Sequence, residues 1–324
     1  MPRRFQSRCR RPGIRPDRPP GYRRALPYNF LQTAVDESAG LCHHPWESSA
    51  DGRAAISLRV TVLASGSSGN AALVESGATR LLVDAGLSRR ETCRRLKSLG
   101  ISVDPLDGIL VSHEHTDHTS GLPALAAHAR CPVFLTQATH QEIVRILPDG
   151  AGKTVDRVEY IEAGQRFSIG EFEVTAFSIP HDAADPVGFA FRAEGVKIAL
   201  VTDLGYLPAV VRFHLRSADC LILESNHDLE MLKVGPYPWS VKQRVMSRTG
   251  HLSNHIVGEF LADPDGFDAR PRYLLLAHLS ENNNTPDLAR ISAEEALGRR
   301  PAQAAFRGEL MIASQRVPVG PLLL

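Results

Sequence analysis

The chain has 324 residues, of which 43% are hydrophobic and 23% charged, and its formal net charge is +1. This length and composition are typical of a globular protein with one large domain or two smaller ones. No apolar run approaches the roughly 18–20 residues that a membrane span requires, so we expect no membrane partner.

The charge is distributed unevenly along the chain. Residues 1–30 contain nine arginines and one acid, Asp17, which gives this segment a net charge of +8. Residues 57–324 contain 27 basic and 31 acidic side chains and therefore carry a charge of −4. Because this larger part is mildly acidic, binding of nucleic acid there would require a local basic patch.

Residues 1–56 are rich in Arg and Pro and show no sustained hydrophobic periodicity. Such a segment cannot bury enough apolar area to offset its ordering entropy, so we predict a disordered N-terminal extension. A basic tether for nucleic acid is the alternative. No apolar segment follows the arginines as in a secretory signal. Residues 57–324 are predicted to form one folded domain.

The five cysteines are odd in number and scattered, without C-x-x-C spacing. This usage argues against a disulfide framework or a structural zinc site and favours a reducing compartment. We therefore predict a cytoplasmic protein.

Ordered structure is expected to begin at Leu58. Short aliphatic runs at 58–65, 71–76 and 79–86 are separated by Gly-Ser turns and predict consecutive antiparallel strands. In residues 89–100, polar and apolar side chains alternate at helical spacing, and the segment ends on Gly100, which predicts a helix capped by this glycine.

The remaining sequence mixes strands with helices. Strand-like runs occupy 107–112, 132–136, 171–180, 187–194, 196–203, 219–225 and 272–278, and helical patterns occupy 118–128, 137–147, 207–216, 237–247 and 285–298. Initial hairpins followed by this mixture predict an α/β (α+β) protein in which two sheets form a sandwich covered by helices.

Four of the apolar strands run into a side chain that can bind metal: His113, His181, Asp203 and His278. Ligands that follow several strands of one sheet layer converge along one edge, where rigid strands hold them in place. The segment HEHTDH adds further candidates, and the full set of seven is His113, His115, Asp117, His118, His181, Asp203 and His278.

This donor set fits two metal ions better than one. His113 and His115, joined by His181, would give one ion three imidazoles, whereas Asp117, His118 and His278 would hold the second. Asp203 would bridge the pair. Imidazole and carboxylate donors suit zinc or manganese, and such a pair would activate a bridging water for attack on an ester or phosphodiester. We therefore predict two divalent ions, Zn²⁺ or Mn²⁺, as cofactors.

The pattern of HEHTDH, PHD at 180–182, TD at 202–203 and AH at 277–278 resembles the metallo-β-lactamase fold superfamily. The resemblance covers residues 58 to about 316. It implies a four-layer αββα sandwich with a binuclear site at the edge of the two sheets. The pattern does not fix the substrate, because the fold hosts many chemistries.

Two further residues point to the nuclease branch. Glu224 ends the run DCLILE, and His251 lies in the turn SRTGHLSN. In enzymes resembling tRNase Z, a comparable Glu orients a His that protonates the leaving oxygen, although this chain has Glu-Ser-Asn where that enzyme has His-Glu-Ala-Thr. The resemblance implies Asp117, Glu224 and His251 as catalytic residues.

The whole pattern is most similar to the YycJ/WalJ-like hydrolases, some of which are 5′-to-3′ DNA exonucleases. The segment YPWSVKQRVMSR supplies a local basic patch with aromatic neighbours, and its alternative is an amphipathic helix with a solvated basic face. The predicted substrate-binding residues are Trp239, Lys242, Arg244, Arg248 and Asn282.

Together these features predict a binuclear metal-dependent nucleic-acid phosphodiesterase, acting on DNA as an exonuclease. A hydrolase of small molecules (a thioester, a lactone or a β-lactam) is the main alternative. A thiolate leaves unprotonated, so Glu224 and His251 would have no role in a thioester hydrolase. The non-enzymatic alternative is a module for nucleic-acid binding or signalling.

Overall fold

The structure is a computed structural model that describes residues 58–102, 105–146 and 155–324. The extension predicted for residues 1–56 lies outside the described residues. No helix in the described part of the chain is long and apolar enough to cross a membrane. Among the described cysteines, Cys93, Cys131 and Cys220 carry free thiols.

The first sheet has seven strands in the order β14-β1-β2-β3-β4-β5-β6. Its initial strands pair antiparallel, as predicted, and the pairs from β3 to β6 are parallel. Its strands are β1 (Arg59–Ala64), β2 (Ala71–Ser76), β3 (Thr79–Val83), β4 (Gly108–Leu110), β5 (Val133–Leu135), β6 (Val158–Tyr160) and β14 (Val319–Leu323).

The second sheet also has seven strands, in the order β13-β12-β11-β10-β9-β8-β7. Strands β7 to β10 pair antiparallel, and β10 to β13 pair parallel. Its strands are β7 (Arg166–Ile169), β8 (Phe172–Ser178), β9 (Val187–Ala193), β10 (Val196–Val201), β11 (Cys220–Glu224), β12 (Tyr273–Ala277) and β13 (Glu309–Ile312).

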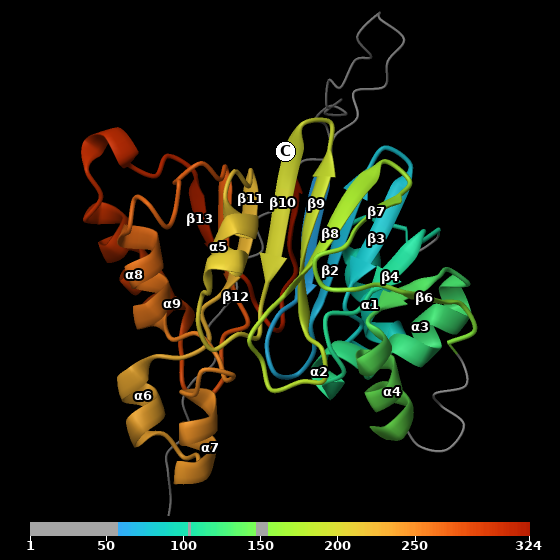
Figure 1. The fold of residues 1–324 in the computed structure, drawn as a ribbon, viewed down its shortest axis with the longest axis horizontal. Coiled ribbons are helices and arrows are strands. Elements are labelled where there is room, and N and C mark those ends of the chain that lie inside the picture. The colour runs from blue at the N-terminus through green and yellow to red at the C-terminus, as the bar shows by residue number, and fades with distance from the viewer. Residues whose placement is uncertain (1–57, 103–104, 147–154) are drawn as a thin grey trace, which may run out of the picture. The chain divides into compact units, whose positions relative to one another are not determined.

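Nine α-helices are present in the described residues, and six of them cover the sheets: α1, α3 and α4 cover the first sheet and α5, α8 and α9 the second (Figure 1). The helices are α1 (Arg89–Ser98), α2 (Thr116–Thr119), α3 (Leu122–Ala129), α4 (Gln137–Ile146), α5 (Ala209–Leu215), α6 (Leu229–Val234), α7 (Trp239–Val245), α8 (Asn254–Ala262) and α9 (Pro286–Gly298).

Three hydrophobic cores define the layers. The central core joins the inner faces of the sheets, with Val60 and Val83 of the first packing in one cluster with Phe189 and Ile222 of the second. The outer faces each pack against helices and form the two other cores. Because side chains alternate along a strand, each sheet buries both faces, and the predicted αββα sandwich is confirmed.

The helix expected over 118–128 is two helices instead, α2 and α3, with a break at Ser120 and Gly121. The Gly121 amide donates to the carbonyl of Ala85, and a Cβ at Gly121 would lie 1.8 Å from the Leu87 carbonyl oxygen. The chain therefore bends so that its backbone can pack on the loop after β3. Strands β6, β7, β13 and β14 and helix α6 had no counterpart among the predicted elements.

Candidate metal centre

All seven predicted metal-ligating residues converge beyond the ends of strands from both sheets. His113 and His115 lie in the loop after β4, and α2 carries Asp117 and His118. From the second sheet come three residues that follow β8, β10 and β12, namely His181, Asp203 and His278. Their donor atoms form overlapping groups in which all atoms lie within 4.8 Å of one another.

We call His113, His115 and His181 the three-histidine group. The His181 Nε2 lies 3.3 Å from the His115 Nδ1. The His113 Nε2 is buried and has no hydrogen-bond partner among the described residues. Burial lowers the pKa of both His113 and His181, which favours the neutral imidazole that a metal ion requires.

We call Asp117, His118 and His278 the mixed group. The Asp117 Oδ2 lies 3.5 Å from the Nε2 atoms of both His118 and His278. The His278 Nε2 is buried without a hydrogen-bond partner in the described part of the chain. One carboxylate oxygen and two ring nitrogens therefore face the same point.

Asp203 lies between the two groups. Its Oδ2 is 3.3 Å from the His118 Nε2, and the same carboxylate forms a group with His113 and His118. This oxygen is buried, and no described residue donates a hydrogen bond to it. Buried polar atoms without partners are costly, and three of them, the Nε2 atoms of His113 and His278 and the Asp203 Oδ2, belong to residues of these overlapping groups. This donor set fits divalent metal ions, and metal binding by these residues stays a prediction.

In the mixed group, carboxylates contact the outer ring nitrogens, which are the Nδ1 atoms on the side of each imidazole away from Asp117. The His118 Nδ1 lies 2.8 Å from the Asp84 Oδ2, and the His278 Nδ1 lies 2.8 Å from the Glu224 Oε1. Burial alone would lower the pKa of each imidazole, but the surrounding carboxylates raise the pKa of His118 well above its usual value and that of His278 to about 10. Such partners fix the tautomer and make the ring a stronger ligand.

Neutral oxygens hold the outer nitrogens of two rings in the three-histidine group. The His113 Nδ1 lies 3.0 Å from the Ser112 Oγ, and the His181 Nδ1 lies 3.3 Å from the carbonyl oxygen of Gly250. These contacts orient the rings without adding negative charge.

Glu224 is fully buried and joins the mixed group to His251. Its Oε1 lies 2.8 Å from the Nδ1 atoms of both His251 and His278, and its Oε2 accepts from the amides of Leu204 and Leu252. Burial opposes charge on both partners, yet their attraction lowers the pKa of Glu224 to about 2 and raises the pKa of His251. This pairing therefore favours the protonated form of His251 beside the candidate metal ligands.

Three of the residues at this edge have left-handed backbone conformations, which residues other than glycine rarely adopt. The φ angles are 59° at Asp84, 63° at Asp203 and 56° at His278, each one or two positions after a strand ends. Such conformations cost about 1–3 kcal/mol each and persist where surrounding contacts enforce them. They turn the polar side chains out of the strand direction and toward the metal centre.

Asp84 and Asn70 were assigned no role at the metal centre. Asp84 directly follows the apolar strand LLV, so the strand-end rule that identified four other residues also applies to it. Asn70 lies in the turn after β1, where its Nδ2 is 3.2 Å from the Asp117 Oδ2 and 3.0 Å from the His118 Nε2. No periodic pattern indicates that contact.

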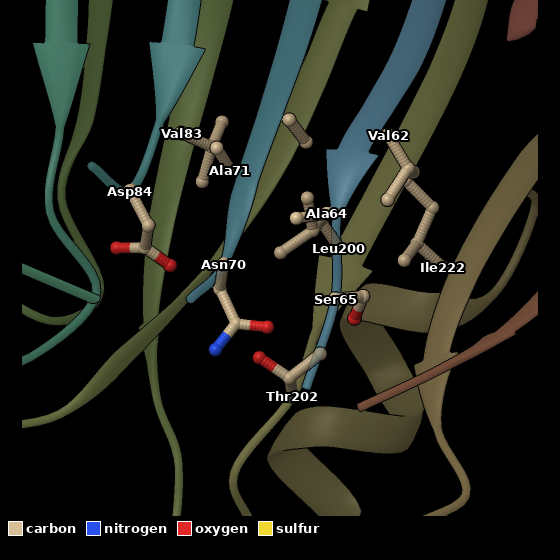
Figure 2. A pocket seen from close by; sticks show the side chains of 11 residues that line it. Val62, Ala64, Ser65, Asn70, Ala71, Val83, Asp84, Leu200, Thr202 and Ile222 are labelled. Atoms are coloured by element: carbon tan, nitrogen blue, oxygen red, sulfur yellow. The ribbon is translucent and has the colours of Figure 1, made fainter. Parts of the chain in front are cut away.

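A small cavity lies between the two sheets behind this edge (Figure 2). Its polar end is formed by Ser65, Asn70, Asp84 and Thr202, and its inner end by aliphatic side chains of both sheets. Since the Ser65 Oγ accepts from the amide of His278, the polar end belongs to the support of the mixed group.

The predicted substrate-binding residues have very different surroundings. Trp239 is exposed at the start of α7, and the Asn282 Nδ2 donates to the Tyr237 hydroxyl. Lys242, by contrast, is buried, and its Nζ donates to the carbonyl of Lys233 at 2.7 Å. This ammonium is held inside the protein, so we no longer assign Lys242 to a basic surface.

The two arginines of the same segment also have partners within the protein. The Arg248 guanidinium stacks on the Tyr206 ring, 4.0 Å from its centre. Arg244 pairs with Asp182 through two nitrogens. The cations of the predicted local basic patch therefore each have their own partner within the protein.

Comparisons with known proteins agree with this architecture. Residues 79–278 match the β-lactamase superfamily domain. The exodeoxyribonuclease YycJ of Bacillus anthracis is 38% identical over 240 residues, which cover 74% of this chain and 89% of the relative. The exodeoxyribonuclease WalJ of Streptococcus pneumoniae serotype 2 is 34% identical over 245 residues, which cover 75% and 90%.

Among solved structures, the metallo-β-lactamase fold protein YhfI of Bacillus subtilis superposes with a TM-score of 0.60 at 21% identity. The match covers 81% of this chain and 99% of that protein. At this identity the likeness shows the shared fold.

Proposed function

Because the chain belongs to the metallo-β-lactamase superfamily, we propose that this metal-dependent hydrolase is a phosphodiesterase that cleaves DNA. The observation that carries the proposal is the Glu224–His251 pair beside the mixed group, with 2.8 Å between the Oε1 and Nδ1 atoms. The names of the two exodeoxyribonuclease relatives support DNA as the substrate and exonucleolytic action as its mode.

Two bound divalent ions, Zn²⁺ or Mn²⁺, would acidify a water and stabilise charge on the phosphodiester. The residues that would hold them are those of the three-histidine and mixed groups, with Asp203 between them. Asp117 faces both rings of the mixed group, where its carboxylate would orient the attacking water and accept its proton.

His251 would then protonate the leaving oxygen. Glu224 accepts from the Nδ1 and leaves the Nε2–H as the proton to be donated, on a side chain that is 16% exposed. Glu224 also raises the pKa of His251, which favours the protonated form of the acid near neutral pH.

This pair favours an oxyester substrate over a thioester. A leaving alkoxide is strongly basic and needs a proton in the transition state, whereas a thiolate leaves unprotonated. In a hydrolase specific for thioesters, the Glu224–His251 pair would not need to donate a proton in the reaction.

A panel of substrates tests the proposal. The full chain loaded with manganese or with zinc is incubated with end-labelled DNA, end-labelled RNA, a thioester and a β-lactam. We expect metal-dependent cleavage of DNA, with product lengths that reveal exonucleolytic action and its direction, which we propose to be 5′ to 3′. Turnover of the thioester or β-lactam without cleavage of DNA would overturn the proposal in favour of a small-molecule hydrolase.

A further inference from the structure

Arg244 lies at the rim of the three-histidine group because Asp182 holds it there. Asp182 directly follows His181, and its Oδ1 is 3.5 Å from the Nε2 through which His181 faces the group. The Arg244 Nη2 donates to that Oδ1 at 3.0 Å, and the Arg244 Nε donates to the Oδ2. One carboxylate therefore connects α7 to the edge of the metal centre.

Resting on the proposed phosphodiesterase function, we propose that Arg244 binds a backbone phosphate of the DNA at this rim. Asp182 acts as a positioning residue that orients the guanidinium. The proposal replaces a diffuse basic patch with one defined phosphate contact.

The geometry of the guanidinium leaves it free to bind an anion. Arginine has five N–H donors, and Asp182 takes two of them from the side, at Nε and Nη2. The remaining three are both hydrogens of Nη1 and one of Nη2. One hydrogen from each of these nitrogens forms the end-on fork that binds phosphate bidentately. The Arg244 side chain is 54% exposed, so this fork is accessible.

The other three cations of the α6–α7 region are less suited to this role. Lys242 is buried against the Lys233 carbonyl, Lys233 pairs with Glu230 at 2.7 Å, and Arg248 stacks on Tyr206. The Arg244 pKa, in contrast, is raised by Asp182 and also by the charge of Asp117 in the mixed group. Its guanidinium thus lies within electrostatic reach of the site where the phosphodiester would bind.

A purely structural role for the ion pair is the competing explanation, because breaking it could displace His181. Salt dependence separates the two explanations. Each phosphate that a protein cation neutralises adds about 0.7–0.9 to the slope of log affinity against log salt concentration. A side chain that only supports the fold contributes nothing to that slope.

Arg270 offers a closely matched control. It also donates from Nε and Nη2 to one carboxylate, that of Asp219, and its side chain is 55% exposed. Asp219 precedes β11, whereas Glu224 ends that strand on the side of the metal centre. Arg270→Gln therefore removes the same charge and the same type of ion pair at the opposite edge of the sheet.

The experiment compares the metal-loaded full chain with Arg244→Gln, Arg244→Lys, Asp182→Asn and Arg270→Gln. For each protein, KM and kcat for an end-labelled DNA oligonucleotide are measured between about 50 and 200 mM salt, and metal content is determined in parallel. For Arg244→Gln we expect KM to rise about tenfold or more and the salt slope to fall by about 1.

The remaining variants identify the cause. Arg244→Lys should keep the slope but lose part of the affinity, because an ammonium retains the charge without the planar fork. Asp182→Asn should keep the slope with a smaller rise in KM, and Arg270→Gln should match the wild-type chain.

An unchanged slope in Arg244→Gln, or an equal change in Arg270→Gln, would overturn the phosphate contact while leaving the proposed function intact. A fall in kcat that parallels lost metal would do the same and assign the ion pair a structural role. Failure of the wild-type chain to cleave DNA would instead overturn the proposed function itself, and this inference with it.

Discussion

The three-histidine group and the mixed group meet at Asp203 but differ in what supports them. Buried carboxylates hold both imidazoles of the mixed group, Asp84 behind His118 and Glu224 behind His278, at 2.8 Å in each case. In the three-histidine group the corresponding partners are a serine hydroxyl and a backbone carbonyl, at 3.0 and 3.3 Å.

This difference predicts two unequal metal sites built from the same type of ligand. A carboxylate partner makes an imidazole more basic and fixes its tautomer, which strengthens metal binding. A neutral partner gives orientation alone. We therefore expect the mixed group to hold its ion more tightly and the three-histidine group to exchange its ion more readily.

Removing one ligand from each group should have the largest effect. His115→Ala and Asp117→Ala should each reduce DNA cleavage to the background of the metal-free protein, because both ions are needed to activate water and stabilise the phosphodiester. Turnover of labelled DNA and metal content per chain are the measurements.

His255 is an exposed histidine of α8, and His255→Ala serves as the control. This substitution should leave both DNA turnover and metal content unchanged. Full activity in either ligand variant would show that its group is not required for the reaction.

His251→Ala should reduce kcat by about 10²–10⁴, the usual contribution of a general acid. Metal content should be unchanged, because the His251 Nδ1 faces the Glu224 Oε1 and His251 is a member of neither the three-histidine group nor the mixed group, although it clusters with Asp203, Glu224 and His278. Rates measured at several pH values should also lose the limb that reports deprotonation of the acid. If His251→Ala retained the wild-type rate, the assignment of the general acid would be wrong.

Replacing the residues that contact the Nδ1 atoms of His118 and His113 tests directly whether the two groups bind their ions with unequal affinity. Asp84→Asn should weaken the ion of the mixed group by about 10–100-fold, as is typical for loss of a carboxylate behind a metal-binding histidine. Ser112→Ala should weaken the ion of the three-histidine group by less than Asp84→Asn weakens that of the mixed group. The Ser112 Oγ also lies 3.0 Å from the Asp84 Oδ2 and 3.2 Å from the His118 Nδ1. Competition with a chelator for each metal ion gives both affinities, and equal losses would contradict the distinction.

The smallest effect concerns the stability of the metal-free protein, to which the two groups should contribute with opposite pH dependence. The folded-state pKa of His278 is raised to about 10, so its stabilising contribution is complete below about pH 6.5 and is lost as the pH rises through 10. The folded-state pKa of His181 is lowered, so stability is lost as the pH falls below about 6.5.

Urea unfolding of the metal-free wild type, His278→Gln and His181→Gln at several pH values measures these contributions. The wild-type advantage over His278→Gln should shrink at high pH, and the advantage over His181→Gln should shrink at low pH. The same sign for both variants would show that the two rings have similar electrostatic surroundings.

Much of the fold could be predicted because its signals are local. Aliphatic runs of strand length and the turns between them identified β1 to β3 and the strands that lead into His181, Asp203 and His278. Strand β14 was missed: its sequence VGPLL contains a glycine and a proline, and it pairs with β1 from the other end of the chain.

The candidate ligands were predictable for a related reason. A polar residue directly after an apolar strand stands out in the sequence, and strand ends of one layer meet at one edge. The same rule applies to Asp84, whose role becomes visible only through His118, 34 residues later.

The sequence by itself determined the composition of the metal centre, since residue type and position relative to the strands are written in the chain. Only the tertiary structure decided what each side chain contacts. Lys242 and Arg244 are two residues apart on one helix, yet one is buried against a carbonyl and the other faces the metal edge. Burial and long-range partners depend on how distant segments pack, and no local pattern encodes them.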